Sequence, residues 1–152
     1  MDFILIFLAK YLIYLMVVVG LIFFVFLSKT LKKQFLATTL LSFVIAYSVG
    51  KVASHFFYNA RPFVLTHTLP LIKHAANNGF PSDHALFSAS IAFVVFSFNK
   101  RVGVFLFLLT LFVGYARIVI GLHHIVDILG SIVIAAISSY IGYILVRNLI
   151  KK

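Results

Sequence analysis

Long, nearly uncharged apolar runs constrain this chain more than any other feature of its sequence. Hydrophobic residues make up 63% of its 152 positions and charged residues only 11%, whereas soluble domains average about half apolar and about a quarter charged residues. A helix of about 20 apolar residues is long enough to cross the hydrocarbon core of a bilayer. The sequence therefore predicts an integral membrane protein.

Five apolar segments have lengths that suit single transmembrane helices, although the third is short. They are Phe3–Leu27, Phe35–Phe57, Asp83–Phe98, Val102–Ile120 and Ile125–Val146. The first has no basic region or small-residue cleavage site before it, so we expect a retained span rather than a signal peptide. No internal repeat or low-complexity linker interrupts the chain. The predicted fold is all-α, a polytopic transmembrane bundle of about five helices, with residues 1–152 as one domain.

Basic residues set the predicted orientation. Eight of them fall on one side if the spans alternate: Lys29, Lys32, Lys33, Lys100, Arg101, Arg147, Lys151 and Lys152. By the positive-inside rule that side is cytoplasmic, and the N-terminus lies outside. Topology thus accounts for most of the net charge of +10, and since no nucleic-acid-reading motif accompanies it we expect no nucleic-acid partner. The absence of cysteine excludes disulfides and thiolate metal sites.

The opposite, outer side gathers nearly all the other ionisable groups. All six histidines belong to it (His55, His67, His74, His84, His123 and His124), together with Arg61, Asp83, Arg117 and Asp127. A single such residue is usually an interfacial anchor. Ionisable groups at membrane depth are costly, however, and a cluster of them on one face favours a functional site.

Three segments of this side lie at the same depth in the membrane: the one around Arg61, the one around Ser82, and the one from Arg117 to Asp127. They do so because the second and fourth predicted helices end there and the third and fifth begin there. Ser82 precedes an apolar run and is a good N-cap, and the free N–H groups of the following turn favour an anion. Arg61 and Arg117 add planar forks that match phosphate oxygens. This combination predicts a phosphate-binding site.

A nucleophile and its partners accompany the predicted phosphate site. His123 and Asp127 are four positions apart, so the carboxylate can reach the imidazole. Such a carboxylate fixes the tautomer and makes the free ring nitrogen a better nucleophile or base. His84 supplies a second imidazole, available as an acid. Cationic clamps, an oriented nucleophile and a proton donor together indicate phosphoryl transfer.

These segments resemble the three motifs of the type 2 phosphatidic acid phosphatase superfamily. The motifs are Arg61-Pro62, Pro81-Ser82-Asp83-His84 and Arg117-x5-His123-x3-Asp127. Most members carry glycine where this sequence has Asp83. With this aspartate, the segment from Phe80 to His84 is more similar to that of the bacterial undecaprenyl-diphosphate phosphatases linked to bacitracin resistance. The resemblance implies a bacterial inner-membrane enzyme that hydrolyses undecaprenyl diphosphate to undecaprenyl phosphate, with its active site on the outer face.

The resemblance also implies residue roles. His123 would form a phosphohistidine, Asp127 would hold its other ring nitrogen, and His84 would protonate the departing oxygen. Arg61, Arg117, Ser82 and Lys51 would bind phosphate oxygens. No metal or other cofactor and no obligate protein partner is expected, only membrane lipids and the lipid phosphate or diphosphate itself.

Several alternatives stay open at this stage. Lys51 is either a phosphate ligand or a lysine that extends to the outer interface, and Asp83 either carries a helix N-terminal charge or modulates His84. His124 is a rival to His123 for Asp127. His55, His67, Lys73 and His74 match no motif. The rival functions are a phosphatidate, phosphatidylglycerophosphate or lipid A phosphatase, and a small non-catalytic membrane protein.

Overall fold

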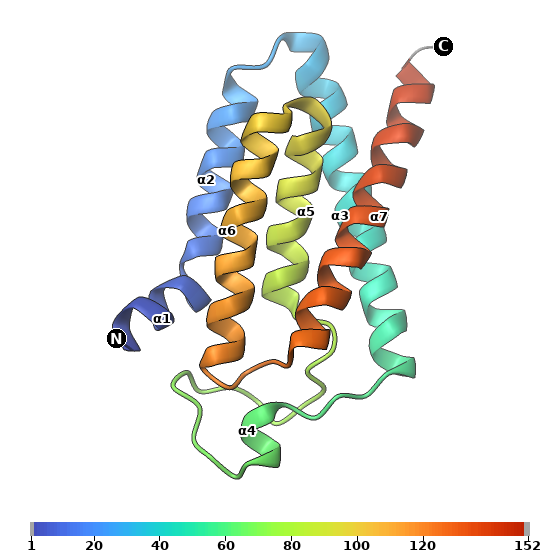
Figure 1. The fold of residues 1–152 in the computed structure, drawn as a ribbon. Helices are drawn as coiled ribbons and strands as arrows, with labels where there is room; N and C mark the ends of the chain where they lie inside the picture. Colours follow the sequence, from blue (N-terminus) through green and yellow to red (C-terminus); the bar gives the residue numbers. More distant parts are fainter. Residues whose placement is uncertain (1, 151–152) are drawn as a thin grey trace.

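The structure is a computed structural model that describes residues 2–150, in which the regular elements are all helices (Figure 1). In chain order they are α1 Asp2–Lys10, α2 Leu12–Val25, α3 Lys29–Phe56, α4 Pro62–Leu65, α5 Asp83–Phe98, α6 Lys100–Val119 and α7 Ile125–Ile150. Lys151 and Lys152, two of the eight basic residues used for orientation, lie outside the described residues.

Three of the helices, α3, α6 and α7, are individually long and apolar enough to span a membrane. They begin or end beyond the expected bounds, with α3 starting at Lys29 and α7 continuing to Ile150. Hydropathy placed these ends within the apolar runs, but helical hydrogen bonding continues into the basic turns. The expected α5 has the bounds Asp83–Phe98, and its 16 residues make it shorter than the others. The expected count of about five is therefore approximate.

The expected straight span Phe3–Leu27 is a bent pair instead. Helices α1 and α2 meet at 45° around Tyr11, and α1 diverges from the bundle in Figure 1. At the bend the carbonyl of Ala9 accepts a hydrogen bond from Arg117 Nη1 at 3.4 Å. A side chain that takes a carbonyl from the helical ladder is an ordinary cause of a kink.

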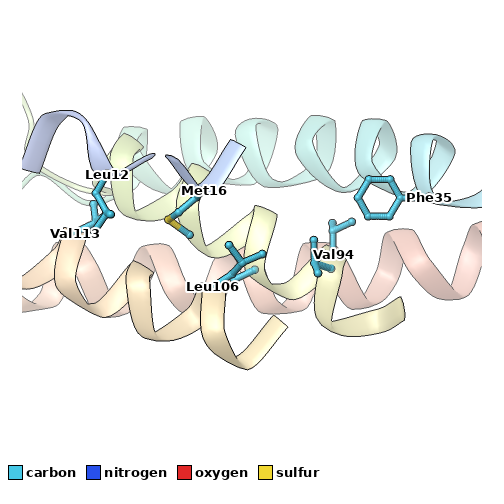
Figure 2. Packing of buried hydrophobic residues seen from close by; sticks show 8 residues of the cluster. Leu12, Met16, Phe35, Val94, Leu106 and Val113 are labelled. Atoms are coloured by element: carbon cyan, nitrogen blue, oxygen red, sulfur yellow. The ribbon is translucent and has the colours of Figure 1, made fainter. Parts of the chain in front are cut away.

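Helix α5 lies at the centre and packs against α2, α3, α6 and α7. Half of its residues are buried, among them Ala85, Ala89 and Ala92, whose small side chains let neighbours approach. The largest apolar cluster lies beside it, with Leu12, Met16, Phe35, Val94, Leu106 and Val113 in contact (Figure 2). Because α5 is short, its N-terminal end lies deeper in the bundle than the neighbouring ends of α3 and α6 (Figure 1).

Helices α3 and α7 approach closely through small residues. A Cβ atom added at Gly142 would lie 2.3 Å from Ser42 Oγ and 3.1 Å from Ser42 N, and such contacts between small residues are typical of membrane helices. We expect Gly142→Ala to force the helices apart, at a cost of about 1–3 kcal/mol. Gly20→Ala is the matched control, since its Cβ would meet only Ile91 at 3.7 Å. Melting temperatures in detergent compare them, and equal melting temperatures would contradict the close approach.

Candidate active site

The ends of α3, α5, α6 and α7 meet at one end of the bundle, under the loop formed by residues 57–82 (Figure 1). Asn78 fixes this loop to the end of α3. Its Nδ2 donates to the carbonyls of Ser54 and Phe57, both at 2.9 Å, and its Oδ1 accepts from Asn59 N and Phe80 N. The segments on either side of the loop are thereby held together.

His123 lies between the two arginines and Asp127. Its Nε2 is 3.0 Å from Arg61 Nη1 and 3.5 Å from Arg117 Nη2. Its Nδ1 is 3.4 Å from Asp127 Oδ2, a long contact that leaves Nδ1 without a well-aligned hydrogen bond. Arginine can only donate, so Nε2 must carry the lone pair and Nδ1 the proton. This tautomer presents Nε2 as the nucleophile.

Burial lowers the pKa of His123, and Arg61 and Arg117 lower it further through their charges. Asp127 opposes both effects but does not cancel them. The imidazole is only 1% exposed. A lowered pKa keeps the ring neutral at neutral pH, which preserves the lone pair on Nε2.

Asp127 lies in the first turn of α7 and also caps it. Its Oδ2 accepts from the backbone N–H of His124 at 2.9 Å, as the acidic residue of a capping box does. The spacing of four positions predicted that His123 and Asp127 lie one turn apart in the same helix. In the structure, His123 instead lies just before the first residue of α7. The His124 ring points elsewhere, with Nε2 3.1 Å from the carbonyl of Ala60. Of the two adjacent histidines, the structure brings only His123 to the arginines.

The two arginines are 5% and 3% exposed, and neither forms an ion pair with a carboxylate in the described chain. Arg61 is held by neutral acceptors, with Nη1 donating to Leu122 O and Nε to Asn77 Oδ1, both at 3.0 Å. Arg117 donates to Ala9 O from the bent N-terminal pair. Buried charges usually have a partner of opposite sign. Two unpaired guanidinium groups therefore indicate an anionic ligand.

Two further unpartnered buried polar atoms lie at the same place. Ser82 Oγ and Arg117 Nε have no hydrogen-bond partner among residues 2–150. Ser82 occupies the N-cap position of α5 as expected, but its side chain makes no capping bond. Its hydroxyl is therefore free to bind a ligand, and leaving such a buried group unsatisfied costs about 1–3 kcal/mol.

His84 lies one residue inside α5 and lines an apolar groove of about 540 Å³ between α2, α3 and α5. The groove extends from Asp83 to Val95, about 18 Å along α5 at 1.5 Å per residue. The charges of Arg117 and His123 act on the His84 imidazole, which places it near these two residues.

Among the described residues, Lys51 forms no hydrogen bond with His123 or Arg117; its exposed ammonium lies 5.2 Å from the Tyr47 ring centre. It does line a polar cavity of about 160 Å³ together with Arg61 and Asp83. A role for Lys51 in phosphate binding stays a prediction.

The four remaining outer residues differ in position. His55, His67 and Lys73 are exposed, while His74 is half-buried. His74 lies close enough for its charge to act on His84. Burial lowers the pKa of His74 from its ordinary value.

Sequence reasoning missed four residues that hold the site together: Asn59, Asn77, Asn78 and Gly79. A Cβ atom at Gly79 would lie 3.0 Å from Asp127 Oδ2 and 3.1 Å from Asn59 O, so the site leaves no room for a side chain there. The Asn-Asn-Gly run before Phe80 is a turn signal. This signal predicts a turn but does not indicate that its residues contact Arg61 and the end of α3.

The sequence profile of the PAP2 superfamily matches residues 35–151. The chain belongs to this superfamily. It is also similar to the crystal structure of Aquifex aeolicus LpxE, with a TM-score of 0.70, 26% identity, and coverage of 93% of this chain and 84% of that one. The expected superfamily and the all-helical membrane fold are thus confirmed.

Two curated relatives come from Bacillus. Each is 33% identical: the bacitracin transport permease protein BcrC of Bacillus licheniformis over 88% of this chain, and the undecaprenyl-diphosphatase BcrC of Bacillus subtilis over 94%. The chain spans 66% of the first relative's length and 74% of the second's. Together with the fold, these similarities make the protein a multi-pass membrane phosphatase of lipid substrates.

Proposed function

We propose that the protein hydrolyses undecaprenyl diphosphate to undecaprenyl phosphate on the outer face of a bacterial cytoplasmic membrane, without a metal. One observation carries the reaction class: two buried arginines, with no carboxylate partner among residues 2–150, converge on Nε2 of a buried histidine. Two relatives carry the name undecaprenyl-diphosphatase, one of them as a putative enzyme in Escherichia coli that is 28% identical over 68% of this chain. These names support the substrate.

The proposed reaction has two steps. The lone pair of His123 Nε2 attacks the terminal phosphorus, and the bond from phosphorus to the bridging oxygen breaks. His84 gives its proton to that oxygen, which leaves as undecaprenyl phosphate. Water then attacks the phosphohistidine, His84 accepts a proton from this water, and cleavage of the P–N bond returns the lone pair to His123.

Arg61, Arg117 and the free Ser82 hydroxyl would bind the three outer oxygens of the transferred phosphoryl group. Arg61 Nη1 contacts Nε2 directly in the unliganded site, so phosphate binding must redirect this N–H to an oxygen before the nucleophile is available. Preorganised donors of this kind stabilise charge that develops in the transition state.

The apolar groove supports a lipid rather than a soluble substrate. Its walls include Phe24 from α2, Phe43 from α3 and Phe87 from α5, and one end is formed by His84. A hydrocarbon tail lying in the groove would therefore begin beside the proposed proton donor. We assign the groove to the polyprenyl tail of the substrate.

Phosphate release by the purified protein in detergent tests the function. We expect turnover of undecaprenyl diphosphate that is unchanged by EDTA and exceeds turnover of phosphatidate and lipid A. Faster turnover of either of these lipids would contradict the proposed substrate but would leave the proposed reaction mechanism unchanged. Loss of activity in EDTA would overturn metal independence, and inactivity on all three lipids would favour a non-catalytic protein.

Two neighbouring valines on α2 test the assignment of the groove to the polyprenyl tail. Val17 lines it, whereas Val18 does not and is 48% exposed on the same helix. We expect Val17→Trp to lower kcat/KM for undecaprenyl diphosphate about tenfold, which corresponds to about 1.4 kcal/mol, and to spare a soluble short-chain prenyl diphosphate. Val18→Trp is the matched control. Equal losses in the two variants, or equal losses on the two substrates, would contradict the assignment.

A further inference from the structure

We propose that Asn59 is a positioning residue of the phosphoryl-transfer site, which holds one oxygen of Asp127 so that the other faces His123. The catalytic part of this inference rests on the proposed function. Asn59 lies outside all three sequence motifs, two positions before Arg61.

The two oxygens of Asp127 have separate partners. Oδ1 accepts from Asn59 Nδ2 at 2.7 Å, whereas Oδ2 faces His124 N at 2.9 Å and His123 Nδ1 at 3.4 Å. With Oδ1 occupied, the carboxylate cannot rotate without losing a short, partly buried hydrogen bond. The Asn59 amide therefore fixes which oxygen is presented to the imidazole.

Asn59 is itself held at two backbone positions. Its N–H donates to Asn78 Oδ1 at 2.9 Å, and its carbonyl accepts from Gly79 N at 2.8 Å. Asn78 in turn is bound to the end of α3 through Ser54 and Phe57. The orientation of Asp127 on α7 thus depends on α3 through the loop. Removing the groups that orient a metal-ligating histidine typically changes activity about 10- to 100-fold, and we expect an effect of the same order here.

Donor and acceptor roles in the same loop provide a sharp test. Asn59 must donate to Asp127, whereas Asn77 accepts from Arg61 Nε at 3.0 Å through its Oδ1. An ionised aspartate can accept but cannot donate. The same change, asparagine to aspartate, should therefore remove the hydrogen bond at position 59 and preserve the one at position 77.

We expect Asn59→Asp to lower kcat about 10- to 100-fold at pH 8, with KM changed less than threefold. Asn77→Asp keeps an acceptor for Arg61 but adds a negative charge beside it, so its loss should appear mainly in KM rather than in kcat. Asn148→Asp, exposed near the C-terminal end of α7, should retain full activity. Two carboxylates at hydrogen-bond distance share a proton as the pH falls. A protonated pair restores the donor, so the deficit of Asn59→Asp relative to the wild type should shrink between pH 8 and pH 6.

The charged and titratable groups that act on His123 are Arg61, Arg117, Asp127 and His84. An added carboxylate beside Asp127 stabilises the imidazolium, so Asn59→Asp should also raise the pKa of His123 in an NMR titration. Asn59→Ala lacks a titrating group, and its loss of kcat should be the same at every pH. These two variants separate positioning from a general weakening of the fold.

Either of two results would overturn the inference: wild-type kcat in Asn59→Ala, or the same pH-independent deficit in both Asn59 variants. If Asn59→Asp does not fold, wild-type kcat in Asn59→Ala alone decides against it. An inactive wild type would instead refute the proposed function. In that case the NMR shift of His123 still tests whether Asn59 acts on the Asp127–His123 pair.

Discussion

His123→Ala is expected to abolish phosphate release, with a loss of about 10⁴-fold or more, because removal of a nucleophile leaves only binding and electrostatic effects. The wild-type enzyme, quenched during turnover, should carry phosphate that is labile in acid and stable in alkali, as on a histidine nitrogen. The variant should carry none. Both readouts follow from the lone pair on Nε2, which faces Arg61 and Arg117.

His124→Ala is the matched control for this experiment. Its ring contacts only the carbonyl of Ala60 in the described contacts, and the backbone N–H that caps Asp127 is kept in alanine. We expect a loss below tenfold and normal phosphoenzyme. The nucleophile assignment would be wrong if His123→Ala retained activity, or if His124→Ala removed the phosphoenzyme.

Arg117→Ala is expected to lower kcat/KM about 10³-fold or more, the effect of an arginine that stabilises transferred phosphoryl charge. Its guanidinium is 3% exposed, and its Nε has no partner in the described chain. Inhibition by orthovanadate, a transition-state analogue, should weaken in parallel, since the same donors bind both.

Arg101→Ala controls for the loss of a positive charge from α6. Arg101 is exposed at the opposite end of this helix, so its removal should leave kcat/KM and vanadate inhibition within twofold of the wild type. Similar losses in the two variants would indicate a general electrostatic or folding effect. In that case Arg117 would not be a phosphate ligand.

The structure separates the sequence-based site residues into two groups. Arg61, Arg117, His123 and Asp127 lie in one buried cluster around the nucleophile. Ser82 and His84 lie beside it, with the Ser82 hydroxyl free. Lys51 and Asp83 are exposed instead and line a neighbouring polar cavity. Distance along α3 explains the position of Lys51, because the helix continues to Phe56 before the chain turns toward Arg61.

The sequence by itself determined the membrane bundle and the end of it that carries chemistry. Apolar runs in a bilayer must satisfy their backbone groups within helices, and this requirement can be recognised locally. The motif spacings are likewise local. They were sufficient to identify the family and to bring His123 within reach of Asp127.

Only the tertiary structure decided the contacts between segments. The hydrogen bond from Asn59 to Asp127 joins residues 68 positions apart. The one from Arg117 to the Ala9 carbonyl, at the bend between α1 and α2, joins residues 108 positions apart. The choice between His123 and His124 also depends on which ring faces the arginines. Such contacts depend on how loops and helix ends pack, and a pattern along the chain carries no record of that packing.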